Sequence, residues 1–408
     1  MKSAFPVLVL MMLFLGTLTF AIKIQPTKAA ATIVVPSDYS TIQAAINAAN
    51  PGDTIYVRNG IYPEHIEVNK TVTLMGESNQ DTIIEAQIQG SFRAGVHITS
   101  NNTIVEDFRI VPINSTIYLE IPTLIMIDGR LATCSNCTIR NCVFVFPTDV
   151  EAGSDAIDVY GSANNTITGN MITIADKSDA GIAVLVNSAG NIIDNNTITG
   201  GWVSITISLA GDDTVTNNYL TGQAPAKISY FADVGSLTLI QSSGDIVKGN
   251  TLINNTLGLS LSEADCSVYQ NNFINNTQQA LTDGDSQVVF DNGYPSGGNY
   301  WSDYNGTDAF SGTYQNRTGS DGIGDTPYII GAGGIDHYPL MKPWAPHILG
   351  DINGDGIVDL KDLVLMACAY GSTPTSTNWD ANADLDGNGR VDLTDLVTLA
   401  THYGQHYP

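Results

Sequence analysis

Basic residues are scarce in this chain. Its 408 residues include only 16 Lys and Arg against 41 Asp and Glu, which gives a formal net charge of −25 at pH 7. A surface of that sign repels nucleic acid and attracts cations. Nucleic acid is therefore excluded as a partner, and some of the acidic excess is expected to consist of metal ligands.

Cysteine and histidine are also rare. Five cysteines in a chain of this length do not make a disulfide framework. Cys134 and Cys137 have CxxC spacing, but no second pair or nearby His accompanies them, so we interpret them as buried small side chains or as one local disulfide. The six histidines are scattered. Because His337 and Met341 are the sole nearby pair of soft ligands, the sequence gives little support to a copper site.

Long apolar runs are confined to the start of the chain. Lys2 precedes an apolar run over residues 4–22, and Ala29-Ala30-Ala31 offers small residues for cleavage. We interpret residues 1–31 as a secretory signal peptide, so the protein is predicted to be extracellular, either secreted or attached to the cell surface. An uncleaved membrane anchor is the alternative, because the run is just long enough to span a bilayer.

The sequence does contain a repeated motif, each copy of which is here called a line. Each line has an apolar β-branched residue, the anchor, which is usually followed three places later by Asn. The shortest spacing between anchors, 21 residues from Val247 to Val268, is too short for two helices per repeat and fits one coil of short strands. The anchors are Ile139, Ile167, Ile193, Val215, Val247, Val268 and Val289; the Asn column is Asn170, Asn196, Asn218, Asn250, Asn271 and Asn292, with Cys142 in the first line.

We therefore predict a mostly β protein built on a right-handed parallel β-helix over residues 32–294, its handedness taken from the general crossover preference. The Asn column is expected to turn the corners, because Asn tolerates left-handed backbone, and to hydrogen-bond from coil to coil. An antiparallel sandwich is the alternative, but it gives no reason to keep one Asn column in register. Helical spacing of Ile42, Ala45, Ile46 and Ala49 predicts a short helix that caps the N-terminal end.

The segment TIQAAINAANPGDTIYVRNGIYPE, the Asn-rich lines and the stretches GGNYWSDYNGTD, DGIGDTPYII and DHYPLM resemble the NosD-like branch of the pectin-lyase-like β-helix superfamily. The resemblance extends over residues 33–344 and implies that residues 295–345 are the C-terminal tail of the β-helix. It also implies polysaccharide as a ligand class, since the superfamily includes pectate lyases, polygalacturonases and pectin methylesterases. The NosD branch itself is linked to copper loading.

No complete catalytic motif of these enzymes is present. GIYPEH resembles the opening signature of pectin methylesterases and Asp212-Asp213 one piece of a polygalacturonase site, but the accompanying motifs are missing. Arg93, Arg109, Arg130 and Arg140 are candidate bases for a lyase. Three insertions are expected to form loops that carry acids and aromatics: Asp149, Glu151, Asp155 and Asp158; Asp176 and Asp179; Lys227, Tyr230, Phe231 and Asp233. Catalytic residues stay unassigned, and a polysaccharide lyase or glycoside hydrolase activity is left open.

Near its C-terminus the chain contains two copies of an acidic loop followed by an apolar stretch, GDINGDGIVDLKDLVLMACAYG and ADLDGNGRVDLTDLVTLATHYG. Oxygen ligands at loop positions 1, 3, 5, 9 and 12, with Gly at the sixth position and a backbone carbonyl at the seventh, suit one hard cation such as Ca²⁺. We therefore predict two Ca²⁺ ions. Their ligands are Asp351, Asn353, Asp355, Ile357, Asp359 and Asp362 in the first loop and Asp384, Asp386, Asn388, Arg390, Asp392 and Asp395 in the second. Asp321 and Asp325 in DGIGD have a similar spacing but lack the later acidic ligand.

A loop followed by an exit helix, repeated once, resembles a type I dockerin over residues 349–405, within a domain that we place at 346–408. The resemblance implies a cohesin-type partner, contacted through Leu360-Lys361 and Leu393-Thr394. We predict a secreted or cell-surface β-helix protein that binds polysaccharide or a cell-surface glycan and is docked through this domain. An enzyme of polysaccharide breakdown and a structural adhesion protein, glycosylated at its Asn-x-Ser/Thr sequons, are the alternatives.

Overall fold

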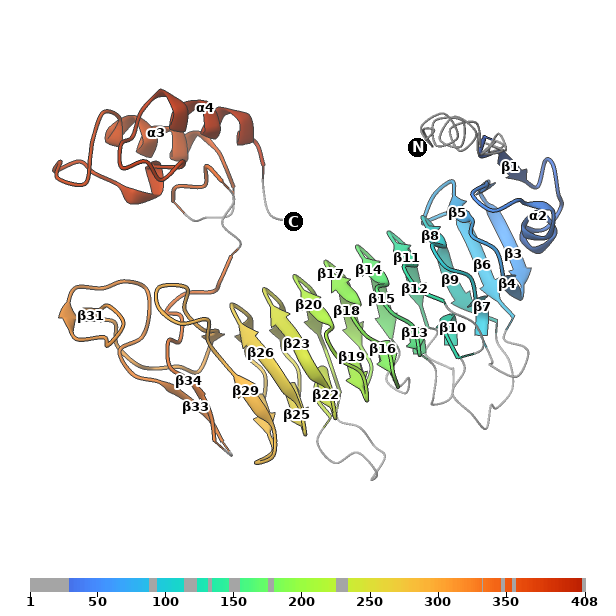
Figure 1. The fold of residues 1–408 in the computed structure, drawn as a ribbon, viewed down its shortest axis with the longest axis horizontal. Coiled ribbons are helices and arrows are strands. Elements are labelled where there is room, and N and C mark those ends of the chain that lie inside the picture. The colour runs from blue at the N-terminus through green and yellow to red at the C-terminus, as the bar shows by residue number, and fades with distance from the viewer. Residues whose placement is uncertain are drawn as a thin grey trace, which may run out of the picture.

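The computed structural model describes residues 29–87, 94–113, 123–130, 134–146, 155–174, 180–224, 234–331, 333–345, 349–353 and 357–405. These residues form a long coil of short strands, followed by a small helical domain (Figure 1). Each complete coil contributes one strand to each of three parallel sheets, here named A, B and C. The predicted parallel β-helix is confirmed.

Sheets A and B follow one another along each coil. In the described part of the chain, sheet A has 11 strands: β1 (Thr32–Val35), β2 (Thr54–Val57), β5 (Thr73–Gly76), β8 (Ile104–Glu106), β11 (Thr138–Arg140), β14 (Thr166–Thr168), β17 (Ile192–Asp194), β20 (Thr214–Thr216), β23 (Ser243–Lys248), β26 (Asp265–Tyr269) and β29 (Gln287–Val289). Sheet B, over the same residues, has 10: β3 (Gly60–Glu64), β6 (Thr82–Ala86), β9 (Arg109–Pro112), β12 (Val143–Val145), β15 (Met171–Ile174), β18 (Thr197–Gly200), β21 (Tyr219–Thr221), β24 (Thr251–Ile253), β27 (Asn272–Ile274) and β30 (Tyr300–Trp301).

Sheet C completes each coil. Its strands within the described ranges are β4 (Ile66–Val68), β7 (Ala94–Ile98), β10 (Thr123–Asp128), β13 (Asp155–Tyr160), β16 (Ala180–Leu185), β19 (Val203–Ser208), β22 (Leu237–Ile240), β25 (Leu257–Ser262) and β28 (Gln278–Thr282). The predicted insertions each stand between a strand of sheet B and the next strand of sheet C. Of the residues named in them, only Asp155 and Asp158 lie within the described part of the chain.

Helix α2 (Ile42–Ala48) caps the N-terminal end, as predicted. Its side chains Ile42, Ala45 and Ile46 are buried against the first coils. The Glu64 carboxylate accepts hydrogen bonds from the Ile42 and Gln43 amides at the positive end of the helix. At the other end, the Lys70 ammonium donates to the Ile46, Asn47 and Ala49 carbonyls. Glu64 of GIYPEH is thus a structural residue that caps this helix.

The C-terminal end is closed by the tail. The Trp301 ring stacks between Phe273 and Tyr328, with centroids 4.3 and 4.4 Å away, and its Nε1 donates to Asp336. Two antiparallel pairs follow: β31 (Phe310–Ser311) with β32 (Arg317–Thr318), and β33 (Tyr328–Ile330) with β34 (Gly334–Asp336). The last domain contains α3 (Leu360–Ala369), the short η1 (Ala381–Ala383) and α4 (Leu393–His402). No helix among the described residues is long and apolar enough to cross a membrane, and residues 4–22 lie outside them.

The Asn column forms a buried hydrogen-bond ladder between sheets A and B. In each step the backbone N–H and the Nδ2 of one Asn donate to the Oδ1 of the next, as from Asn196 to Asn218 at 2.9 and 3.0 Å. The predicted corner role was wrong, because the left-handed residue is the one before the ladder position, for example Asn195 (φ 52°) and Asn217 (φ 54°). Ladder asparagines stabilise the corner by hydrogen bonding, and the residue before each of them makes the turn.

The last predicted line is out of register by one residue. Cys266 pairs with Val288, so the inward position falls on Phe290, which is 1% exposed, whereas Val289 is 57% exposed. Asn292 is not in the ladder either; Asn299 takes the place below Asn271 and donates in turn to Asp336. The register changes here because the tail, and not another coil, follows.

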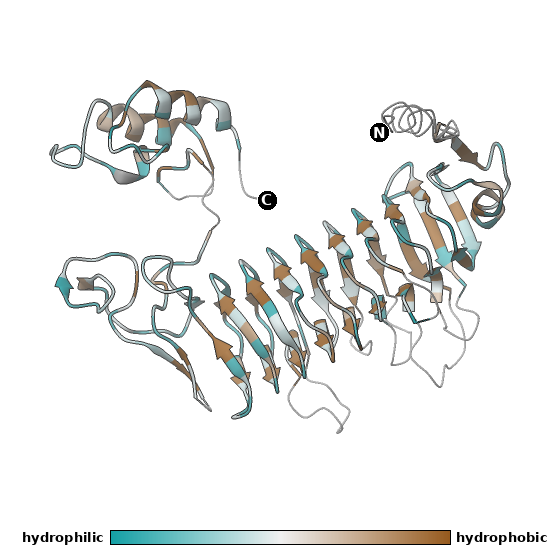
Figure 2. Ribbon diagram, in the orientation of Figure 1, coloured by the Kyte–Doolittle hydropathy of each residue, from teal (hydrophilic) through white to brown (hydrophobic). Residues whose placement is uncertain are grey.

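The core is one continuous column of aliphatic side chains from Val35 to Ile330. In Figure 2 the hydrophobic colour follows the strands of successive coils and the hydrophilic colour marks many of the turns. Four cysteines are buried free thiols and Cys368 is an exposed one. Cys134 and Cys137 lie with their sulfur atoms 3.8 Å apart, unbonded, so they agree with the buried-side-chain interpretation.

Candidate functional site

The second acidic loop brings three carboxylates together. Oxygen atoms of Asp384, Asp386 and Asp395 lie within 4.8 Å of one another, and among the described residues these are the one group of three or more His, Cys, Asp or Glu side chains close enough to hold a metal ion together. Asn388 is beside them, because its backbone N–H donates to both Asp384 and Asp386. A cluster of carboxylate and amide oxygens of this kind is the ligand set that Ca²⁺ prefers.

The loop is held in shape by the carboxylate at its twelfth position. One oxygen of buried Asp395 accepts from the backbone amides of Leu385 and Asp386 at 2.8 and 3.2 Å, and the other accepts from Asp392 at 2.7 Å. Asp392 is the N-cap of α4 and forms a capping box with Asp395. The shorter Asp, in place of the Glu of ordinary calcium loops, therefore ties the start of the loop to the start of the helix.

The first loop repeats this construction. Asp362 accepts from Ile352 and Asn353 at 2.8 and 3.1 Å and from Asp359 at 2.8 Å, and Asp359 caps α3 in the same way. Asp351 is buried at the start of this loop. The predicted ligand Asp355 lies outside the described residues. Carbonyl coordination by Ile357 and Arg390 stays a prediction.

The two helices that leave the loops present matching apolar residues to solvent. Leu360 and Leu393 are each 62% exposed, and Val364 and Val397 are each 53% exposed. On the other side, Met366 and Leu399 are buried in the small core of this domain. Leu360 with Val364, and Leu393 with Val397, are here called the two exposed helix faces. Such faces are typical of a surface that binds another protein.

The Asp212-Asp213 pair, which resembles one piece of a polygalacturonase site, is divided between surface and interior. Asp212 is exposed, whereas Asp213 is completely buried in a second ladder between sheets C and A. The members of that ladder stand two places before the anchors: Cys137, Asn165, Asn191, Asp213 and Asp245. This second ladder could have been found in the sequence, because Cys137 and Cys266 both stand two places before their anchors. Asp213 is structural, and a polygalacturonase-like role for the pair is not supported.

A charged network lies on the outer face of sheet C. Buried His97 contacts Glu67 through Nδ1 at 2.9 Å and Asp128 through Nε2 at 3.1 Å, so its imidazolium form can donate to both. Arg130 donates to both oxygens of Asp128 at 2.8 and 3.0 Å and lies 4.3 Å from the centre of the Tyr160 ring. Burial raises the pKa of Asp128, but the hydrogen bonds from Arg130 and His97 outweigh it and lower the pKa.

Two of the four arginines proposed as lyase bases are held in ion pairs. Arg130 is paired with Asp128, and Arg140 with Glu106 at 2.5 Å. Arg109 lies in β9, and Arg93 lies outside the described residues. A guanidinium held by a buried carboxylate is stabilised in its charged form, which does not suit a proton-abstracting base.

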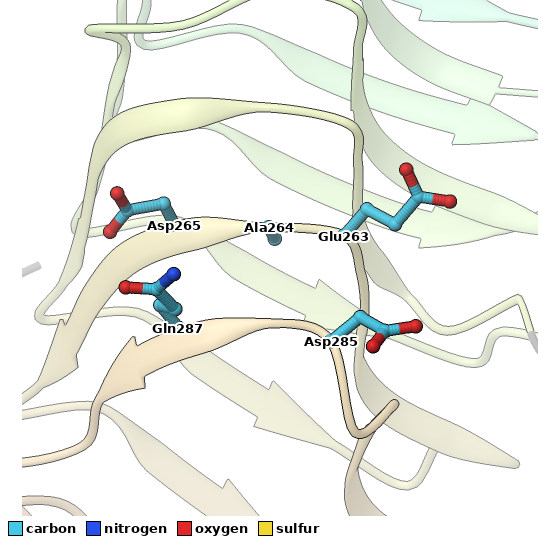
Figure 3. A pocket seen from close by; sticks show the side chains of 5 residues that line it. All are labelled: Glu263, Ala264, Asp265, Asp285 and Gln287. Atoms are coloured by element: carbon cyan, nitrogen blue, oxygen red, sulfur yellow. The ribbon is translucent and has the colours of Figure 1, made fainter.

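Other acids of the described chain do not converge. Asp321 accepts from Gly312, and Asp325 from Ala309 and Phe310, so both hold the backbone of the tail. A pocket of about 380 Å³ near β26 and β29 is lined by Glu263, Asp265, Asp285 and Gln287. Figure 3 shows Asp265 and Glu263 at opposite ends of this group. The pocket is acidic but its carboxylates do not form a common centre.

Fold and loops together define a parallel β-helix protein that carries a duplicated acidic loop-and-helix domain. Residues 123–306 match the family model described as periplasmic copper-binding protein (NosD), and residues 349–402 match the Dockerin type I domain. The chain thus combines a NosD-like domain with a C-terminal type I dockerin. A search of curated proteins found no match.

Several solved structures resemble the chain at low identity. They include an alginate lyase from Paenibacillus sp. (14% identity, 66% of this chain and 97% of that chain, TM-score 0.40) and the pectin methylesterase from Aspergillus niger (15%, 61% and 87%, 0.41). DFA-IIIase from Arthrobacter chlorophenolicus A6 is similar at 15% (65% and 95%, 0.41). These values give no information about the activity of this chain.

Copper does not fit the matched segment. Residues 123–306 contain no histidine. Cys134 and Cys137 lie close together, whereas the other buried thiols of this segment are distributed along the coil. Copper sites take imidazole or several soft ligands. By contrast, the oxygen-only ligands of the terminal loops fit Ca²⁺, the ion that type I dockerins bind.

Proposed function

We propose that this protein is an extracellular or cell-surface β-helix protein that binds polysaccharide and is docked through its dockerin to a cohesin-type partner. The observation that carries the proposal is the duplicated loop-and-helix domain, whose two loops repeat the same hydrogen bonds 33 residues apart, as from Asp362 to Asp395. Each loop holds one Ca²⁺ ion, and the ions fix the helices that present the partner-binding faces.

The division of the chain follows from this proposal. Residues 1–31 act as a signal peptide, 32–294 form the β-helix, 295–345 its tail and 346–408 the dockerin. The polysaccharide part of the proposal is supported by the β-helix architecture and by the superfamily resemblance. A binding role suits the structure better than a catalytic one, because Arg130 and Arg140 are ion-paired and Asp213 is buried.

Partner binding belongs to the exposed helix faces. Leu360 and Leu393 stand at the loop positions that the dockerin resemblance assigns to partner contact, and their exposure is equal. Apolar side chains at the centre of an interface contribute most of its affinity. Because the two faces are equivalent, either one can serve a single cohesin.

The test is Ca²⁺-dependent capture of the full-length protein on a panel of immobilised type I cohesin modules. We expect capture by at least one module in Ca²⁺ and release by a chelator. The double variant Leu360→Asp with Leu393→Asp should lose at least about tenfold in affinity, since two buried apolar contacts are replaced by charges. Asp285→Ala, on the β-helix, is the matched control. Capture that is equal with and without chelator would contradict the proposal.

A further inference from the structure

The segment that leads to the dockerin is attached to the outside of the β-helix. The Trp344 backbone N–H donates to Oδ1 of Asn272 at 2.7 Å, and Nδ2 of Asn272 donates back to the Trp344 carbonyl at 2.9 Å. The Trp344 ring lies against Gly249, where an added Cβ would stand 2.8 Å from the ring. These contacts hold an aromatic side chain in place against the corner of sheets A and B.

A cleft of about 340 Å³ lies beside this tryptophan. Its other walls include Tyr219 and Thr251 on sheet B and Asn195 and Asn217 from the turns before it. Tyr219 is 43% exposed and stands two strands from Asn272 in the same outward column, which corresponds to about 10 Å. The volume is near the lower limit of roughly 300–1,000 Å³ that is common for small-ligand sites.

The hydrogen-bonding groups in the cleft are amides and hydroxyls. Among the described residues, the exposed Asn195 side chain makes no hydrogen bond, and Asn217 uses its Nδ2 on Asp194. The Thr197 side chain is also exposed. Polar groups of this kind, next to aromatic surfaces, bind hydroxyl groups while the rings contact C–H faces.

Within the described part of the chain, no charged residue lines the cleft, although the sequence contains 41 Asp and Glu. An acidic glycan would need cationic partners, which this lining does not supply. The pocket of Figure 3 differs, because its carboxylates would repel an acidic glycan and need a cation. The lining at Trp344 therefore selects for an uncharged, hydroxyl-rich ligand.

We propose that the cleft between Tyr219 and Trp344 binds a neutral polysaccharide, with sugar rings packed on the two aromatic side chains and hydroxyl groups bonded to Asn195 and Asn217. The proposal rests on the polysaccharide-binding part of the proposed function and gives it a place and a substrate class. Trp344 stands five residues before Leu349, so the proposed glycan site lies close in sequence to the start of the dockerin.

The test is native affinity electrophoresis of the full-length protein in gels that contain one soluble polysaccharide each. Hydroxyethyl cellulose, xylan and galactomannan are the neutral probes; polygalacturonate and alginate are the acidic ones. We expect retardation by at least one neutral probe. Tyr219→Ala and Trp344→Ala should each weaken it at least about tenfold, because each removes an aromatic contact surface. Tyr314→Ala, at a tyrosine that is 84% exposed, is the matched control.

A substitution that blocks the cleft distinguishes loss of binding from loss of folding. Thr197→Trp keeps both aromatic side chains and fills the cleft, so it should also abolish retardation while the melting temperature stays near that of the unaltered protein. Unchanged retardation of all three cleft variants would overturn the cleft assignment and leave polysaccharide binding intact. Retardation by the acidic probes alone would overturn the neutral class. No retardation by any probe would refute both the cleft and the polysaccharide part of the proposed function.

Discussion

The carboxylate of Asp213 shows how a ladder position changes the chemistry of one residue. Its Oδ1 accepts two hydrogen bonds from Asn191, at 2.7 and 2.9 Å, but its buried Oδ2 has no partner among the described residues. Burial is the main cause that raises the pKa of Asp213 to about 6; the negative charges of Asp245 and Asp212 act in the same direction, and the hydrogen bonds from Asn191 act against it. The folded protein therefore holds a proton here more tightly than the unfolded chain does.

The pH dependence follows from that sign. Because the folded pKa lies above the ordinary value of 3.8, stability from this group is highest at low pH and falls as pH rises from about 4 through about 6. Above that range the ionised carboxylate costs about 3 kcal/mol, taken at 1.36 kcal/mol per pKa unit.

Asp213→Asn should remove this cost. The amide keeps the acceptor for Asn191 and supplies a donor toward Asp245, as Asn191 does toward Asp213. At pH 7.5 we expect the free energy of unfolding to rise by about 1–3 kcal/mol, with little change at pH 4. Denaturant unfolding at both pH values measures this, and Asp212→Asn is the exposed control. A gain of equal size at both pH values would show that ionisation is not the cause.

At the residue scale, sequence alone located most ladder positions and predicted their hydrogen bonds from coil to coil, but it wrongly assigned the left-handed turn to the same residues. The Asn column was visible because ladder and anchor residues repeat together. The left-handed turn residues could not be separated from them, since Asn195 and Asn196 have the same propensities and differ only in burial. Phe290 was missed because the tail, not a further coil, determines the last register.

At the scale of single elements, the two ladders supply the hydrogen bonds at the corners of the coil. In other folds, helix caps and hairpin turns supply such bonds. Asn218 accepts from the Asn196 backbone and side chain and donates to the Ile193 carbonyl and to Asn250. Removing it leaves several buried groups without partners, and each costs about 1–3 kcal/mol. Ladder residues therefore stabilise the coil far more than outward residues of the same strands.

Asn218→Ala should lower the free energy of unfolding by about 2–5 kcal/mol. Thr199→Ala, at an outward position of β18, should change it by less than about 0.5 kcal/mol. Chemical denaturation followed by tryptophan fluorescence measures both, since Trp301 is buried in the C-terminal end of the core. Similar losses for the two variants would show that the ladder has no special contribution.

The helices α3 and α4, which leave the two loops, were predictable from the sequence. The capping residue, the acidic loop pattern and the spacing of apolar residues all indicate a helix after each loop. Position 12 serves two purposes, as an expected ligand and as the third helical residue of a capping box, and both purposes favour Asp in this geometry. The sequence could not show the exposed helix faces as a pair, because their equivalence depends on which side of each helix packs on Met366 and Leu399.

The whole molecule combines a rod-like β-helix with a separate small helical domain (Figure 1). The two proposed binding sites are divided between them, with the uncharged cleft at Trp344 on the β-helix and the two exposed helix faces on the dockerin. The cleft was not predictable from sequence, because Tyr219 and Trp344 are far apart in the chain and line the same cleft through the contacts of Trp344 with Asn272 and Gly249. The docking domain was predictable, because its ligands lie within short loops.

We propose that the repeated loops hold Ca²⁺ and thereby form a docking domain. Calorimetric titration of Ca²⁺ into chelator-treated full-length protein measures this, with the variants Asp351→Ala, Asp384→Ala and, as a control in the tail, Asp321→Ala. We expect two sites, of which each loop variant loses one, at a cost of about tenfold or more in affinity at the altered loop, while the control keeps both. Absence of binding, or two unaltered sites in both loop variants, would overturn the proposal.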